Sequence, residues 1–179
     1  MPPVLETNRM VLRVPRNSDL NYIHRLGANP HVMQYITSGK LQSLQDARAD
    51  LSRRRRTARC RLGYWVAEER KSGAFIGWMA LKQGERKQEA ELGYRFLEEQ
   101  WGRGFATEGS LEILDYAFRE LRLEKVIAVS MEENRASTRV MEKLGMSFCG
   151  HIRAYGRQCV RYEIVRRQFE QRHYPEMMK

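Results

Sequence analysis

The sequence has few of the residues that build disulfide frameworks or metal centres. Its three cysteines, Cys60, Cys149 and Cys159, are odd in number and show no C-x-x-C spacing. The four histidines are scattered, with no H-x-x-x-H or H-E-x-x-H pair. We therefore expect reduced, structural cysteines and no bound metal.

Long apolar runs and low-complexity segments are also missing. No stretch reaches the roughly 18 apolar residues that a membrane span needs, and the opening MPPVLETNRM lacks the charged and then apolar layout of a secretory signal. We expect a cytoplasmic protein that makes no membrane contact. With 179 residues, 42% of them hydrophobic, and no repeat or composition break, the chain is predicted to form one domain, 1–179, with a core over about 8–168.

Acidic residues are outnumbered, because 32 lysines and arginines stand against 22 aspartates and glutamates, and the formal charge is +10. Such a balance favours encounter with polyanions, so nucleic-acid contact is allowed but not required. The densest basic segment is SRRRRTARCR, residues 52–61. It is either an anion-docking face or a solvated helix end, and charge runs usually stay in water.

Hydrophobic periodicity changes along the chain between the helical and the strand period. A strand opens the chain, two helices follow, three strands form the middle, and the helical period returns from Phe105. The predicted strands are 8–15, 62–69, 74–82, 89–97, 125–131, 147–155 and 159–167, the predicted helices are 19–29, 41–58, 105–125 and 133–146, and 174–179 is a frayed tail. The single crossover helix predicts that strands 89–97 and 125–131 are parallel, in an otherwise antiparallel sheet.

The stretch EQWGRGFATEG, residues 99–109, places a glycine turn at the start of the crossover helix. Gly102 and Gly104 let the backbone approach a ligand, and free amide groups at a helix N-terminus favour phosphate. No Lys-Ser or Lys-Thr follows, and Thr107 stands where a dinucleotide fingerprint needs glycine. A pyrophosphate held by the amides of about 102–107 and by Arg103 fits this pattern, and glycines for close helix packing are the alternative.

This stretch resembles the acetyl-CoA pyrophosphate loop of the GNAT N-acetyltransferase superfamily, whose pattern is Q/R-x-x-G-x-G/A. Trp101 departs from the first pattern position and resembles the W-G-x-G-x-A variant of the RimJ/RimL branch, the ribosomal-protein N-terminal acetyltransferases. LETNRMVLRVPRNSDL, AELGYRFL and ENRASTRVMEKLGM resemble that branch too, and together the stretches span most of the chain. The resemblance implies a mixed α+β fold with a splayed, mostly antiparallel sheet, one parallel pair and flanking helices.

The resemblance also implies acetyl-CoA as the cosubstrate and identifies residues to bind it. The pantetheine arm is expected at the exposed backbone of strand 89–97, and Asn134 and Ser137 match the N-x-x-S pattern of the branch. Helix capping is the alternative for Asn134 and Ser137. The implied cofactor-binding residues are Tyr94, Arg95, Phe96, Leu97, Gly102, Arg103, Gly104, Phe105, Ala106, Thr107, Asn134 and Ser137.

Direct transfer to an amine needs a base for the amine and a donor for the departing thiolate. Glu91 is the candidate for a water-mediated base, because it alternates with Ala90 and Leu92; an ordinary solvent-facing carboxylate is the alternative. Many superfamily members carry a tyrosine acid where this chain has Met141. Ser137 therefore becomes the candidate hydrogen-bond donor to the thiolate.

The expected function is acetyl transfer from acetyl-CoA to a primary amine, above all a protein N-terminal α-amine such as that of a ribosomal protein. A small-molecule amine, namely a polyamine, an aminoglycoside or an amino acid, is the near alternative. A non-catalytic acyl-CoA sensor or a basic RNA- or ribosome-binding module is the alternative from another class. Both a monomer and a homodimer agree with the sequence.

Overall fold

The computed structural model describes residues 1–36, 38–57 and 61–178. In this part of the chain the strands form one eight-stranded sheet in the order β1-β2-β3-β4-β5-β6-β8-β7. The strands are β1 (Leu5–Glu6), β2 (Met10–Arg13), β3 (Gly63–Glu69), β4 (Phe75–Gln83), β5 (Glu89–Phe96), β6 (Lys125–Met131), β7 (Ser147–Ala154) and β8 (Arg157–Val165). The main helices are α1 (Leu20–Ala28), α2 (Pro30–Met33), α3 (Leu44–Thr57), α4 (Phe105–Asp115), α5 (Arg135–Lys143) and α6 (Arg166–His173).

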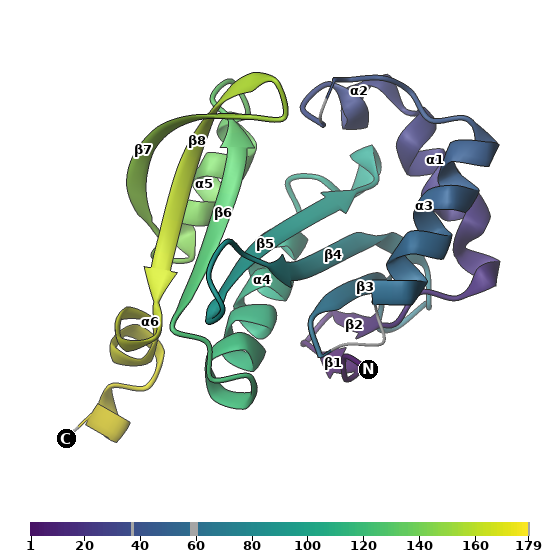
Figure 1. Cartoon of the computed structure of the whole chain (residues 1–179). Helices are drawn as coiled ribbons and strands as arrows, with labels where there is room; N and C mark the ends of the chain where they lie inside the picture. The colour runs from purple at the N-terminus through teal and green to yellow at the C-terminus, as the bar shows by residue number, and fades with distance from the viewer. Residues whose placement is uncertain (37, 58–60, 179) are drawn as a thin grey trace.

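The predicted parallel pair is present, and it is short. β5 and β6 pair in parallel only from Glu89 opposite Lys125 to Glu91 opposite Ile127, whereas all other neighbouring strands pair antiparallel. Beyond Glu91 the two strands diverge toward their carboxyl ends (Figure 1). The predicted splayed α+β sheet is therefore confirmed, and its opening lies where the glycine turn leaves β5.

The larger hydrophobic core lies between the sheet and α4 and α5. Alternate residues of the strands face it, as Ala90 and Leu92 of β5 do, and the crossover helix supplies Leu114 and Phe118. The third glycine of the loop stretch, Gly109, brings α4 close to β4, because an added Cβ would collide with the Met79 sulfur. This glycine serves packing, unlike the two in the turn.

A second core lies on the opposite face of the sheet, under α1 and α3. It contains Ile23 and Leu26 of α1, Ala47 of α3 and Phe75 of β4. Helix α3 packs on β3 and helix α1 on β4, so the two helices lie over this part of the face (Figure 1). The arginine-rich helix α3 turns one face inward, since Ala47, Leu51 and Arg54 are all buried.

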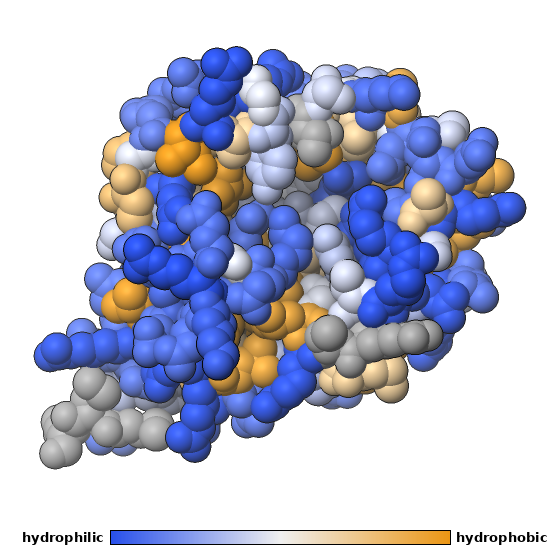
Figure 2. Space-filling view, in the orientation of Figure 1, coloured by the Kyte–Doolittle hydropathy of each residue, from blue (hydrophilic) through white to orange (hydrophobic). Residues whose placement is uncertain are grey.

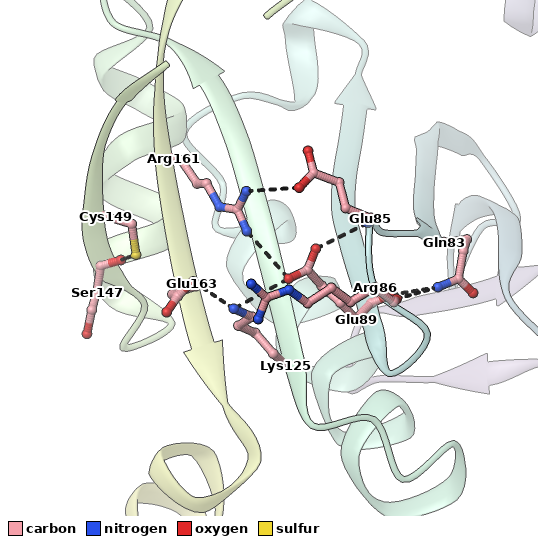
Figure 3. A network of polar contacts seen from close by, with 9 residues as sticks. All are labelled: Gln83, Glu85, Arg86, Glu89, Lys125, Ser147, Cys149, Arg161 and Glu163. Atoms are coloured by element: carbon pink, nitrogen blue, oxygen red, sulfur yellow. Dashed lines mark hydrogen bonds and ion pairs between the residues drawn. The ribbon is translucent and has the colours of Figure 1, made fainter. Parts of the chain in front are cut away.

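An ionic cluster joins the two halves of the sheet at the closed end of the parallel pair (Figure 3). The buried Glu89 carboxylate lies 3.4 Å from Lys125 Nζ and 3.4 Å from Arg161 Nη2, and Lys125 also lies 3.2 Å from Glu163. Three strands thus converge on one buried carboxylate. This closed end lets the other end of the pair open without separating the halves.

The C-terminal segment differs from the prediction. Strand 159–167 was expected to continue through Arg166 and Arg167, but β8 ends at Val165 and α6 begins at Arg166. The reason is tertiary, because the α6 side chain Phe169 is buried and Arg166 Nε donates to the Leu123 carbonyl oxygen at 2.9 Å. The short β1 and α2 were not predicted either.

The surface is mostly hydrophilic on the face that Figure 2 shows, with apolar side chains in small patches. The basic run 52–61 is only partly solvated: Arg54 turns inward and is 4% exposed, whereas Arg53, Arg55 and Arg56 are exposed. Residues 58–60, including Cys60, lie outside the described residues. Among the described helices none is long and apolar enough to cross a membrane.

Candidate active site

A cavity of about 460 Å³ opens at the diverging ends of β5 and β6. The glycine turn and the start of α4 form one wall, α5 another, and α2 with the residues after it a third. Its lining residues are His31, Val32, Tyr35, Ile36, Tyr94, Arg95, Phe96, Gln100, Trp101, Gly102, Gly104, Phe105, Ala106, Thr107, Asn134, Ala136, Ser137, Arg139, Val140 and Lys143. Most of the sequence-predicted cofactor residues are thus brought together, and Leu97 and Arg103 are not among the lining residues described.

The glycine turn has the backbone geometry that a phosphate site requires. Gly102 and Gly104 have φ of 71° and 82°, in the left-handed region that favours glycine. The first main-chain bond of α4 runs from Glu108 N to the Gly104 oxygen, so the amides of residues 105–107 have no acceptor within the helix. These amides line the cavity and carry the positive end of the helix dipole, which fits an anionic pyrophosphate.

Trp101, the departure from the family pattern, has a structural role in the turn. Its indole Nε1 donates to the Phe96 carbonyl oxygen at 3.0 Å and ties the turn to the end of β5. The Phe96 carbonyl therefore already has a donor. Because β5 pairs with β6 only as far as Glu91, the β6-facing backbone edge near Tyr94 and Arg95 is left for a ligand.

Ser137 and Tyr94 meet across the cavity. Tyr94 OH lies 3.3 Å from Ser137 Oγ, and burial raises the pKa of Tyr94 to about 12, so the phenol stays protonated and can donate. Asn134 Oδ1 accepts from Ser137 N at 3.2 Å and caps α5. The capping alternative is thus realised for Asn134, and its amide nitrogen is the group left to face a ligand.

Glu91 lies on the opposite face of β5 from Tyr94. Its Oε1 is 2.7 Å from Lys82 Nζ and 3.1 Å from Tyr155 OH. Burial alone would lower the pKa of Lys82, but the hydrogen bond and charge of Glu91 outweigh this and raise it. Glu91 is not one of the described cavity-lining residues, so a base at this position would act through an intervening group such as water.

Arg103 is not among the described cavity-lining residues, and its side chain is held by neighbouring groups. Its Nη1 lies 2.5 Å from Gln100 Oε1 and its Nη2 lies 3.6 Å from Glu69. A residue far away in sequence supports the turn from beneath: Arg9 Nη1 donates to the Arg103 carbonyl oxygen at 2.9 Å, and the Arg9 side chain pairs with Glu108 at 2.6 Å. The predicted phosphate role of Arg103 stays a prediction, and Arg9 is a residue that sequence reasoning missed.

Two cations on α5, Arg139 and Lys143, line the cavity and were also missed. Their spacing of four places them on one helix face, and neither belongs to the N-x-x-S pattern. The lining residues of α2 and of the segment after it, such as Val32 and Tyr35, were missed because the segment after Pro30 gave no periodic signal. His31 Nδ1 lies 2.7 Å from Glu98 Oε1 and holds this wall to the loop after β5.

The charge of the cavity is one-sided. Its described lining residues include Arg95, Arg139 and Lys143, and they include no aspartate and no glutamate. A second hollow of about 630 Å³ lies at the closed end of the parallel pair and is lined by Glu89 and Lys125 of the ionic cluster. In the described part of the chain no group of three or more potential metal ligands is found.

Comparison with known proteins decides the family. Residues 9–147 match the family described as an acetyltransferase (GNAT) domain. The chain belongs to this GNAT family. It is an acetyl-CoA-dependent N-acetyltransferase, because that is the chemistry of the family and the loop geometry fits coenzyme A.

Individual relatives do not agree on an acceptor. YkkB, an uncharacterized protein of Bacillus subtilis, is 33% identical, covering 89% of this chain and 94% of its own. The spermidine N(1)-acetyltransferase of Escherichia coli is 28% identical, covering 79% of this chain and 74% of its own. Each is a relative of this GNAT protein, and their names leave its acceptor amine undetermined.

Solved structures confirm the fold. A GNAT-family acetyltransferase from Bacillus anthracis superposes with a TM-score of 0.83 at 23% identity, covering 92% of this chain and 99% of that one. Mycobacterium smegmatis RimJ in complex with CoA-disulfide gives a TM-score of 0.82 at 20% identity, covering 95% and 90%. At these identities the likeness concerns the GNAT fold alone.

Proposed function

We propose that this GNAT protein acetylates protein N-terminal α-amines, with acetyl-CoA as the donor. The observation that carries the proposal is the absence of any carboxylate among the described cavity-lining residues. An α-amine of pKa near 8 needs only about 1.4 kcal/mol to become neutral at pH 7, whereas a lysine amine of pKa near 10.4 needs about 4.6 kcal/mol. Any carboxylate base, Glu91 included, would act from outside the described lining and through water, and such weak assistance suits the α-amine better than the lysine amine.

The same charge pattern bears on the alternatives. A polyamine carries several positive charges, and a cavity lined by arginine and lysine without a carboxylate repels it. A small amine with no net positive charge, such as a free amino acid, is the second candidate, because a cavity lined by arginine and lysine does not repel it. The resemblance of the loop and of the N-x-x-S helix to the RimJ/RimL branch supports the protein N-terminus.

The chain's residues divide the work of transfer among them. Acetyl-CoA supplies the activated thioester, and the amides of 102–107 would hold its pyrophosphate. Ser137 Oγ, already accepting from Tyr94 OH, can turn its own proton toward the departing thiolate and stabilise it by a hydrogen bond. Glu91 is the base we propose, removing the amine proton through water.

The experiment measures thiol release from acetyl-CoA against N-terminal peptides, amino acids, polyamines and aminoglycosides at several salt concentrations, with the product identified by mass spectrometry. We expect release with N-terminal peptides and acetylation at the α-amine. Release only with spermidine would contradict the proposal. Tight acetyl-CoA binding without release on any amine would indicate a sensor, and salt-sensitive RNA binding without acetyl-CoA binding would indicate the basic module.

A further inference from the structure

Arg95 lines the active-site cavity. It lies on the face of β5 opposite to the face that carries Tyr94 and is nearer to α4. It follows Tyr94 on β5, so its side chain lies on the other face of the strand, where it is opposite Trp78 of β4. Its guanidinium carbon lies 5.1 Å from the centre of the Trp78 ring, and Nη1 lies 3.5 Å from Met33 Sδ. A thioether is a weak acceptor, so these contacts leave most of the guanidinium's hydrogen-bonding capacity unused.

A second arginine, Arg54 of α3, is buried against the same tryptophan. Its guanidinium lies 3.8 Å from the Trp78 ring centre, and it pairs with Asp50 through Nε at 2.8 Å and Nη2 at 2.7 Å. Asp50 is also the partner of the exposed Arg53. One carboxylate thus serves Arg54 and Arg53, and Arg95 has no ion-pair partner among the described residues.

Both arginines also have a guanidinium nitrogen without a hydrogen-bond partner among the described residues. Arg95 Nε and Arg54 Nη1 are both buried and have no hydrogen-bond partner in the described part of the chain. Residues 37 and 58–60, which lie outside the described residues, are Thr, Ala, Arg and Cys, and none of these side chains is a carboxylate. The nearest carboxylate on the same strand face is Glu91, and it is engaged with Lys82 and Tyr155.

The pKa of Arg95 is lowered by this arrangement. Burial, and after it the positive charge of Arg54, lower the pKa of Arg95 to about 10. The guanidinium is still protonated at neutral pH, so the cavity holds a charge that an anion would stabilise. A half-buried arginine with free donors is the group that binds carboxylates and phosphates in a two-point geometry.

Coenzyme A is not the source of that anion. Its phosphates belong at the glycine turn, on the α4 side of β5, whereas Arg95 faces the α2 and α3 side. On this side Gly93 lies between Glu91 and Arg95, and an added Cβ there would meet no atom within 4 Å. There is therefore room for a ligand between the proposed base and the arginine.

We propose that Arg95 binds a carboxylate of the acceptor, so that the preferred acceptor is an amine that also carries a negative charge. This inference rests on the proposed function and specifies its substrate. Two sources supply the chemistry: a protein N-terminus with aspartate or glutamate in its first residues, and a free amino acid with its α-carboxylate.

The test compares matched acceptors that differ only in charge. Peptides beginning with aspartate or glutamate are compared with their asparagine or glutamine forms, and free amino acids with their amides, by kcat/KM for thiol release. We expect the carboxylate form to be preferred by about 10- to 100-fold, as for a hydrogen bond to a charged group. If the carboxylate preference is larger among the peptides, the acceptor is an acidic protein N-terminus; if it is larger among the amino acids, the acceptor is a free amino acid. Equal kcat/KM for carboxylate and amide forms would overturn the inference and leave the proposed acetyltransferase function intact.

Variants locate the preference in one residue. Arg95→Met keeps an unbranched stem and removes the charged guanidinium, and we expect it to abolish the preference by raising KM for the carboxylate acceptors. Arg95→Lys should retain part of it. Arg48→Met removes the same charge from an exposed position of α3 and should retain the full preference. A preference unchanged in Arg95→Met would also overturn the inference, whereas no release with any amine would reject the proposed function itself.

Discussion

The hydroxyl pair of Ser137 and Tyr94 gives the sharpest prediction about the chemistry. Ser137→Ala removes a donor to the departing thiolate, and a hydrogen bond to a charged group contributes about 1.5–3 kcal/mol, or about 10- to 150-fold in kcat. Tyr94→Phe removes only a hydrogen bond between neutral groups, about 0.5–1.5 kcal/mol. Since the Tyr94 OH to Ser137 Oγ distance of 3.3 Å is long, a two- to fivefold loss, roughly the lower half of that range, is expected.

The double variant separates a positioning role of Tyr94 from an independent one. If Tyr94 acts through Ser137, Tyr94→Phe adds nothing to the loss already caused by Ser137→Ala. The assay is initial-rate thiol release, with acetyl-CoA affinity measured by calorimetry to show that binding is retained. Thr138→Ser is the control, because the Thr138 hydroxyl bonds the Arg135 carbonyl oxygen and does not line the cavity. Wild-type turnover of Ser137→Ala, or losses that multiply in the double variant, would refute the reasoning.

Three further predictions concern the base, the turn and the fold. Glu91→Gln should lower kcat/KM at pH 7 by about tenfold or more, because a positioned base that neutralises the amine is lost, and a wild-type kcat/KM would exclude Glu91 as the base. Gly104→Ala, at φ 82°, should raise KM for acetyl-CoA several-fold through about 1–2 kcal/mol of strain in the turn, whereas Gly73→Ala, at φ 69° in the β3–β4 turn, should leave it unchanged. Asp19→Asn should lower the urea-derived free energy of unfolding by about 2 kcal/mol, because it removes one of the two carboxylates that pair with the buried Arg13, at 2.7 Å, and leaves only Glu68 at 2.5 Å; a change below about 0.5 kcal/mol would contradict this.

The sheet and its opening were predictable because they follow from periodicity and connectivity. Alternating apolar residues identified the central strands, and one crossover helix required one parallel pair. Helix α6 was not predictable in this way. Its sequence, RRQFEQRH, has a single apolar residue, Phe169, and the helix depends on the burial of that ring beneath it. The two-residue β1 and the four-residue α2 are likewise too short to show a repeating hydrophobic pattern in the sequence.

The site divides in the same way. The glycine turn and Ser137 could be proposed from the sequence because local motifs contain them, and the turn has left-handed φ values at Gly102 and Gly104; their roles toward the cofactor stay predictions. The unpaired charge of Arg95 could not. It depends on Arg54, Asp50 and Trp78, which come from two other elements, and only the folded chain shows that one carboxylate is shared.

Strand β5 explains how one short segment can serve two substrates. In a continuous sheet, successive residues point to opposite faces and lie in separate environments. Here β6 leaves β5 after Glu91, so Tyr94 and Arg95 point to opposite faces and still line one cavity. Tyr94 faces Ser137 of α5, and Arg95 faces Met33 of α2 and Trp78 on the other side of the strand. In the roles that we propose for them, the divergence of the two strands brings a thiolate-stabilising pair and an anion-binding arginine within one site, and a one-residue shift in the register of β5 would exchange their faces and remove both proposed functions at once.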